Sequence, residues 1–83
     1  MTEKGEKKAF DKELDTRGLF CPEPLFEVRN TSETLEKGQI LKVLADDPAA
    51  EEDFKRWAKR TGTELLDLKK EKNEFIFYFR IIN

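Results

Sequence analysis

The C-terminal segment, residues 74–82, constrains the fold of this chain more than any other part of the sequence. Its side chains alternate between two faces, of which one is wholly apolar and the other mixed. The apolar face holds Phe75, Phe77, Phe79 and Ile81, and the mixed face holds Ile76, Tyr78, Arg80 and Ile82. A period of two residues is that of a β-strand with one buried face. The chain must therefore build a sheet that is covered on the side of the three phenylalanines.

A first helix that can provide this cover is predicted over residues 22–37. Its apolar or small side chains recur at steps of three and four residues, as on one face of a helix. They are Leu25, Val28, Ser32 and Leu35. Gly38 follows, and a left-handed cap of the helix C-terminus is expected there.

A second helix is predicted over residues 48–61, with Asp47 as its N-cap and Pro48 at its first position. Its inward face is formed by Ala50, Phe54, Trp57 and Ala58, and Gly62 is expected to end it. Charges on the remaining positions run from acidic to basic, as the helix dipole favours. We interpret this charge run as a solvated helix face.

Strands are predicted over residues 9–15, 39–45, 64–70 and 74–82. The order is β-α-β-α-β-β, and the fold class is α/β, more closely an α+β two-layer sandwich with two helices on one face of a four-stranded mixed sheet. Residues 1–8 are expected to be a disordered charged tail and residues 9–83 a single domain. Because helices cover one face only, Ile76 and Tyr78 are expected to be exposed on the other. We expect a monomer that self-associates weakly at most.

The composition excludes several kinds of site. There is no histidine and only one cysteine, which rules out a Cys–His pair, an internal disulfide and a Cys-x-x-Cys pair. We expect neither a metal nor a cofactor. The net charge is -2, with acids and bases interspersed, so no direct binding of nucleic acid is expected. No apolar run approaches the roughly 20 residues of a membrane span, and an unpaired thiol fits the cytoplasm.

The single cysteine, Cys21, lies at the predicted start of the first helix and is followed by Pro22, Glu23 and Pro24. Proline is tolerated in the first turn of a helix, and a helix N-terminus favours the thiolate form of a cysteine. Since neither proline has an N–H group, the nearest amide able to donate to the sulfur is that of Glu23. The residues alone leave two interpretations open. Cys21 is either a reactive thiol or a buried small apolar residue.

The sequence around this cysteine resembles the TusA/SirA family of small sulfur-carrier proteins. The matching positions are Leu14-Asp15-x-x-Gly18-Leu19-x-Cys21-Pro22-Glu23-Pro24, then Val28-Arg29, Gly38 and Ala45-Asp46-Asp47-Pro48-Ala49. The resemblance extends from about Leu14 to the C-terminus. It implies the same order of strands and helices.

The resemblance also implies a function. Cys21 would hold sulfane sulfur as a persulfide, received from a cysteine desulfurase or a rhodanese-like donor and passed to an acceptor protein. In the best-known branch the sulfur ends in 2-thiouridine of tRNA, and other branches serve sulfur oxidation or have unassigned roles. Arg29 and Asp47 match positions at the face where partners of the family dock. Phe20 departs from the arginine that is typical of the tRNA-thiolation branch, and it is expected to line an apolar docking surface.

Three functions are therefore compared. The first is a stoichiometric sulfur carrier, with Cys21 as the carrier and Pro22, Glu23 and Pro24 shaping its helical turn. The second is an interaction or regulatory module in which Cys21 is inert. The third, nucleic-acid binding, is disfavoured by the charge pattern.

Overall fold

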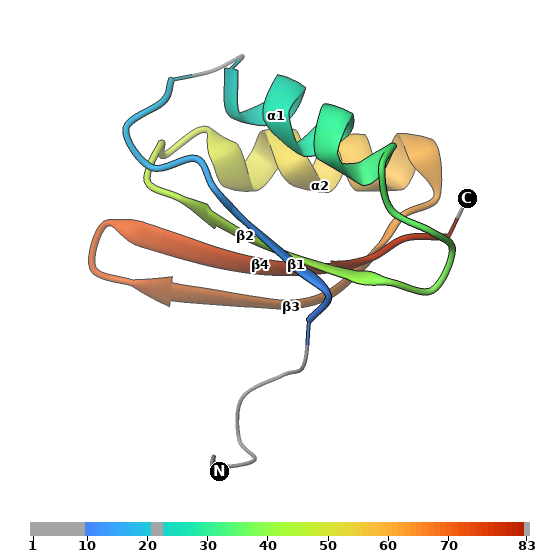
Figure 1. The fold of residues 1–83 in the computed structure, drawn as a ribbon. Coiled ribbons are helices and arrows are strands. Elements are labelled where there is room, and N and C mark those ends of the chain that lie inside the picture. The colour runs from blue at the N-terminus through green and yellow to red at the C-terminus, as the bar shows by residue number, and fades with distance from the viewer. Residues whose placement is uncertain (1–9, 21–22, 83) are drawn as a thin grey trace, which may run out of the picture.

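The structure is a computed structural model that describes residues 10–20 and 23–82. The strands are β1 (Lys12–Asp15), β2 (Ile40–Ala45), β3 (Glu64–Glu71) and β4 (Glu74–Arg80), and the helices are α1 (Glu23–Ser32) and α2 (Ala50–Thr61). Figure 1 shows both helices lying side by side on one face of the sheet. The predicted α+β two-layer sandwich with the order β-α-β-α-β-β is confirmed.

The sheet is mixed and has the strand order β1-β2-β4-β3. β1 pairs with β2 in parallel, whereas β4 is antiparallel to both β2 and β3. The parallel pair requires a crossover, which α1 provides. Along β3 the register shifts between Leu65 and Asp67, a β-bulge on an edge strand.

The largest side chains of the core are aromatic rings that join α2 to the sheet. The ring of Phe54 meets that of Phe77 edge-on at 4.8 Å between centroids, and the ring of Trp57 meets that of Phe79 at 5.5 Å. Val28 of α1 is buried in the same cluster. This confirms that the phenylalanines of β4 lie beneath the helices.

The first helix ends earlier than predicted, at Ser32, and Gly38 does not cap it. The hydroxyl of Ser32 donates to the backbone carbonyl of Arg29 at 2.8 Å, and the hydroxyl of Thr34 donates to the backbone carbonyl of Thr31 at 2.7 Å. Such bonds from side chain to backbone compete with helix continuation. Gly38 has a φ of 91°, but it lies in the turn before β2, where its N–H donates to the carbonyl of Ile81.

The second helix begins at Ala50, two residues later than predicted, and Asp47 is not its N-cap. A carboxylate oxygen of Asp47 accepts from the N–H of Ala49 at 3.1 Å, and its carbonyl accepts from the N–H of Ala50 at 2.8 Å. These bonds close a turn over Pro48 before the helix starts. Gly62 ends the helix with a φ of 80°, as expected.

The open face of the sheet is less exposed than predicted. Ile76 is half-buried there, and Tyr78 is only 4% exposed. Tyr78 lies on an interior strand, opposite Lys42 on one side and Asp67 on the other. The stems of such neighbours shield an aromatic ring from water. Phe10 lies against Lys42, with the Lys42 Nζ 5.0 Å from its ring centroid.

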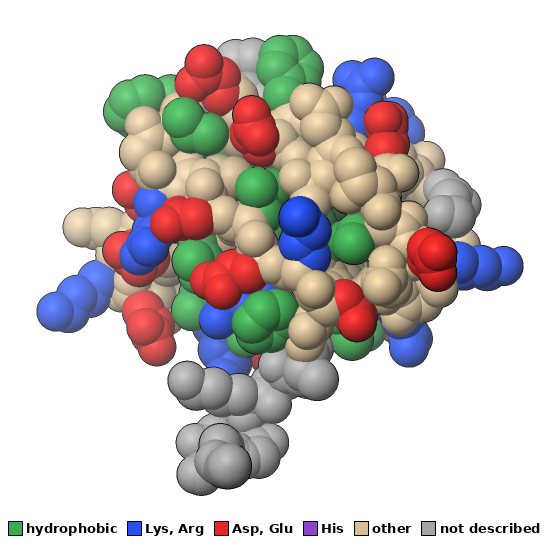
Figure 2. Space-filling view, viewed as in Figure 1, with side chains coloured by type: hydrophobic (Ala, Val, Ile, Leu, Met, Phe, Trp, Pro, Cys, Tyr) green, Lys and Arg blue, Asp and Glu red, His purple; other side chains and the backbone are tan. Residues whose placement is uncertain are grey.

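The predicted solvated face of α2 is confirmed. Lys55 pairs with Glu51 at 2.8 Å, and Arg56 pairs with Asp53 at 3.6 Å, along the exposed side of the helix. In the view of Figure 2, acidic and basic side chains are interspersed over the described part of the chain.

A matched pair of helical phenylalanines tests the core. Phe54 is fully buried, whereas Phe26 is 50% exposed. We expect Phe54→Ala to lower the free energy of unfolding by about 3–5 kcal/mol, because it leaves a cavity beneath α2. Phe26→Ala should change it by about 1 kcal/mol or less. Urea denaturation followed by circular dichroism measures both, and equal effects of the two variants would contradict this core.

Candidate functional site

The candidate site is the loop that joins β1 to α1. Because β1 and β2 run in parallel, their carboxyl ends lie at the same end of the sheet (Figure 1). Residues 16–20 lead from that end to the first helix. Cys21 and Pro22, the predicted carrier and its neighbour, lie outside the described residues. The site is therefore built from the residues on either side of them.

Thr16 fixes the beginning of the loop. Its side chain is fully buried, and its Oγ1 donates to the carbonyl of Leu44 at 2.6 Å. Its backbone N–H donates to the same carbonyl at 2.8 Å. A buried hydroxyl with a partner holds its segment firmly, since leaving either group unpaired is unfavourable. The loop therefore starts from a fixed point on β2.

Asp46, the residue after β2, holds the middle of the loop. Its two carboxylate oxygens lie 3.0 and 3.3 Å from the backbone nitrogen of Gly18, which donates to them. Gly18 has a φ of 88°, a conformation that glycine adopts without strain. The loop is thus held at Thr16 by Leu44 of β2 and at Gly18 by Asp46, the residue that follows β2.

A cluster of exposed charges lies beside this loop. The carboxylate of Asp15 accepts two bonds from the guanidinium of Arg17, both of 2.9 Å, and Arg17 also approaches Glu74 at 3.5 Å. The hydrogen bonds from Arg17 lower the pKa of Asp15 to about 2. The same pairing raises the pKa of Arg17 further above its usual range. Both charges are thus retained over the whole physiological range.

The first turn of α1 differs from expectation in one bond. The N–H of Glu23 donates to the carbonyl of Phe20 at 2.9 Å. The amide that was expected to face the sulfur therefore already has a backbone acceptor. Pro24 is buried in this turn, and Glu23 is exposed at the helix N-terminus, where a carboxylate suits the dipole.

Two exposed phenylalanines flank the cysteine in the sequence. Phe20 is 73% exposed and Phe26 is 50% exposed. They are two of only four large hydrophobic side chains described as exposed, and both lie within five positions of Cys21. Exposed large apolar side chains are candidates for contact with other proteins. We call Phe20 and Phe26 the phenylalanine patch.

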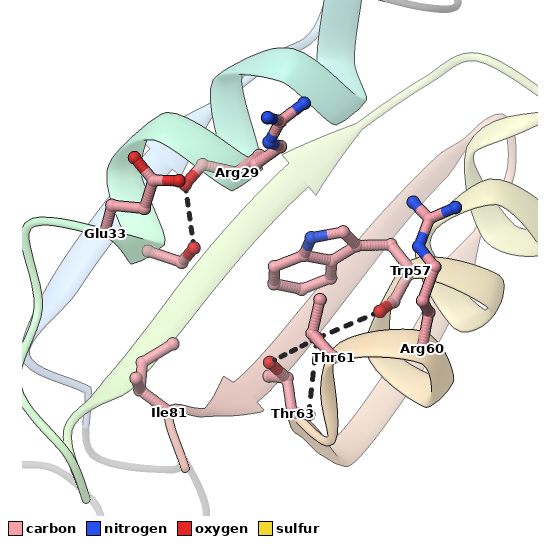
Figure 3. Close-up of a pocket in the computed structure, with 8 residues that line it drawn as sticks. Arg29, Glu33, Trp57, Arg60, Thr61, Thr63 and Ile81 are labelled. Carbon is pink, nitrogen blue, oxygen red and sulfur yellow. Dashed lines mark hydrogen bonds between the residues drawn. The ribbon is translucent and has the colours of Figure 1, made fainter. Parts of the chain in front are cut away.

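The other two predicted docking residues lie apart from each other. Asp47 follows β2 at the end of the sheet where the loop lies, but it is only 9% exposed and holds the turn before α2. Arg29 is exposed in the last turn of α1, farther along the helix. There it borders a hollow of about 480 Å³ between the two helices (Figure 3).

The described part of the chain lacks two further features. No helix within residues 10–20 and 23–82 has both the length and the apolar character needed to cross a bilayer. Nor do those residues contain a cluster of three or more carboxylate, imidazole or thiol groups arranged to hold a metal ion.

The comparisons with known proteins agree with one another. The sequence pattern of the sulfurtransferase TusA family matches residues 12–81. The chain belongs to the TusA family. A sulfur carrier protein TusA from Allochromatium vinosum is 42% identical over 71 residues, which cover 86% of this chain and 93% of that protein. A putative sulfur carrier protein from Archaeoglobus fulgidus is 48% identical over 59 residues, which cover 71% of this chain and 77% of that one.

The fold agrees with a solved relative as well. The crystal structure of a SirA-like protein from Desulfitobacterium hafniense superposes with a TM-score of 0.76 at 20% sequence identity. The match covers 88% of this chain and all of the other. It establishes a shared fold.

Sequence reasoning missed the residues that hold the loop. Thr16 and Asp46 carry no local signal of their role, since their partners, Leu44 and Gly18, lie 28 residues away. Phe26 was missed because its position in α1 fits neither the buried face nor a charged surface. An apolar residue off the helical period is the signal that identifies it.

The bond between Asp46 and Gly18 is testable. We expect Asp46→Ala to speed the hydrogen exchange of the Gly18 amide and to lower the free energy of unfolding by about 1 kcal/mol, because the loop loses an acceptor. Asp46→Asn keeps an acceptor oxygen and should retain part of the protection. Amide exchange followed by NMR measures both. Unchanged exchange at Gly18 in the alanine variant would show that the bond does not hold the loop.

The pKa of Asp15 gives a second prediction. An unperturbed aspartate has a pKa of about 3.9, and in the folded chain the pKa of Asp15 is about 2. Since folding lowers the pKa, the pair stabilises the fold above pH about 4, and this contribution is lost as the pH falls towards 2. An NMR titration of the Asp15 carboxyl carbon should have its midpoint near pH 2. Arg17→Met should raise that midpoint, whereas Glu74→Gln, which removes a carboxylate that competes for the same guanidinium, should not raise it. An unchanged midpoint in Arg17→Met would contradict the assigned cause.

Proposed function

We propose that this protein carries sulfane sulfur as a persulfide on Cys21. It would take the sulfur from a donor protein, a cysteine desulfurase or a rhodanese-like enzyme, and pass it to an acceptor protein. Membership of the TusA family and relatives named sulfur carriers support this role. The observation that carries it is structural. Helix α1 begins two residues after Cys21, and the preceding loop is fixed to β2 by Thr16 and Asp46.

The transfer step is a displacement at sulfur. The Cys21 thiolate attacks the terminal sulfur of the donor's persulfide, and a new S–S bond forms on Cys21. The S–S bond of the donor breaks, and its cysteine leaves as a thiolate. One thiolate is consumed and one is released, so no external oxidant or reductant is needed. The second step repeats the exchange, with the acceptor's thiolate attacking Cys21's terminal sulfur.

The N-terminus of α1 supports this chemistry electrostatically. The positive end of a helix favours the thiolate form of Cys21, which is the nucleophile in the first step. The partner proteins would supply the remaining acid–base groups, so the absence of histidine is no obstacle. A reducing compartment such as the cytoplasm would keep the thiol free. The protein acts here as a monomeric, stoichiometric carrier.

The phenylalanine patch gives the partners a surface to dock on. Phe20 and Phe26 present exposed rings on both sides of Cys21 in the sequence, and such rings are enriched at the centres of interfaces. Pro22, Glu23 and Pro24 would shape the turn between them. Arg29 and Asp47 complete the proposed docking residues, Asp47 through the turn it holds and Arg29 through direct contact. The acceptor serves tRNA thiolation or another route of sulfur trafficking.

Cysteine substitution separates a carrier from an inert module. Incubation with a cysteine desulfurase and cysteine should add one sulfur atom to the intact chain, and a thiol reductant should remove it. Cys21→Ser should take up none, because no other thiol exists in the chain. Mass spectrometry of the intact protein measures the uptake. A wild-type chain that gains no sulfur from desulfurase or rhodanese donors, yet still binds them, would favour the interaction module.

Variants of the patch refine this experiment. Phe26→Glu should slow the uptake of sulfur without changing the thermal stability, since the ring is half exposed. Phe10→Glu is the matched control, because Phe10 is similarly exposed but lies by Lys42 on the open face of the sheet. If both variants slowed uptake equally, the patch would not be the docking surface.

A further inference from the structure

The hollow between the last turns of α1 and α2 has the features of a separate binding site. Its volume is about 480 Å³, and the side chains that line it come from both helices and the strand ends (Figure 3). Those that matter here are Arg29 and Glu33 on the side of α1, Trp57 and Arg60 from α2, and Ile81 after β4. Hollows of 300–1,000 Å³ are typical of small-molecule sites.

The indole of Trp57 provides a buried donor without an acceptor. Trp57 is only 3% exposed, and its N–H has no hydrogen-bond partner among residues 10–20 and 23–82. The ring is held edge-on to Phe79, so it cannot simply turn to solvent. Figure 3 shows the indole between Arg29 and Arg60, with its nitrogen on the edge nearer Arg29. A buried donor is unfavourable unless something accepts from it.

Two guanidinium groups border the same hollow. The guanidinium groups of Arg29 and Arg60 form no ion pair and no hydrogen bond within the described parts of the chain. Arg56, one turn before Arg60, is paired with Glu52 and Asp53 instead. The helix dipole explains why basic residues occupy these last turns. It does not explain why an unpaired indole N–H lies between them.

The balance of charge favours a monoanion. Arg29 and Arg60 contribute two positive charges and Glu33 one negative charge, which leaves the lining with a net charge of +1. Guanidinium groups bind carboxylates through paired N–H donors. A phosphate dianion would meet the carboxylate of Glu33 as well.

The floor of the hollow is apolar. The ring of Trp57 and the side chain of Ile81 are both buried and both line it. The wall beside them is fixed, because the Oγ1 of Thr61 donates to the Trp57 carbonyl at 2.9 Å and lies 2.9 Å from the Oγ1 of Thr63. An apolar floor beneath charged donors suits a ligand with an acidic head and a hydrocarbon body.

We propose that this hollow binds a small organic carboxylate. Arg29 and Arg60 hold the carboxylate group, the Trp57 N–H donates to one of its oxygens, and the hydrocarbon body lies against Trp57 and Ile81. This site is distinct from Cys21 and needs no thiol. It shares Arg29 with the proposed docking residues, but its occupation does not require a persulfide on Cys21.

The single tryptophan of the chain reports on the site directly. Sodium butyrate, titrated at constant ionic strength, should shift the fluorescence of Trp57 saturably in the millimolar range. Acetate lacks two of butyrate's methylene groups and should bind up to about fifteenfold more weakly, because each one removed from water is worth up to about a fourfold change in affinity. 1-Butanol, which lacks the carboxylate, should give no saturable shift. Inorganic phosphate should bind more weakly than butyrate.

Variants decide whether the guanidinium groups are responsible. Arg60→Gln and Arg29→Gln should each weaken butyrate binding about tenfold, through loss of a charge-assisted pair. Arg56→Gln, a matched change outside the hollow, should leave binding unchanged. Cys21→Ser should also bind normally, so a failure of this proposal is distinguishable from a failure of sulfur carriage. No saturable response to butyrate, tighter binding of phosphate, or unchanged binding in Arg60→Gln would overturn it.

Discussion

The edge-on packing of α2 on β4 is the contact on which the rest of this structure depends. Phe54 and Trp57 meet Phe77 and Phe79 with ring centroids 4.8 to 6.2 Å apart. Few other large side chains are fully buried among residues 10–20 and 23–82, so these rings supply much of the stabilisation of the fold. The position of α2 in turn fixes the hollow beside α1, because Trp57 belongs to both the core and the hollow.

The parallel pairing of β1 and β2 fixes where the loop that precedes the proposed carrier begins. Two strands that run in the same direction end together, so the residues that follow them, Thr16 and Asp46, lie at one end of the sheet. The carbonyl of Leu44 in β2 and the carboxylate of Asp46 after it accept hydrogen bonds from the loop and hold it. A carrier that must meet two partners in turn benefits from a loop held in one geometry, because less conformational freedom is lost at each encounter.

The sequence predicts those parts of the fold whose signals are local and periodic. The alternation in β4 and the helical spacing in α2 each repeat over several residues, and both faces were identified correctly. The end of α1 was wrong because Ser32 and Thr34 bond back to the preceding carbonyls, a choice that periodicity does not show. The prediction that Asp47 is the N-cap of α2 was wrong, because Asp47 closes a turn over Pro48 before the helix begins. Of the candidate site, the family resemblance indicated Cys21 and its turn, whereas the support from Asp46 depends on a contact across 28 residues.

The two edge strands of the sheet are poor templates for a further strand. β1 spans only four residues, and β3 carries the bulge at Leu65 to Asp67 and ends in Lys69, Lys70 and Glu71. Short, irregular and charged edges do not accept a further strand from another chain. These edges disfavour growth of the sheet into a ribbon of many copies. The exposed phenylalanine patch lies outside both edge strands, beside the start of α1 in the sequence.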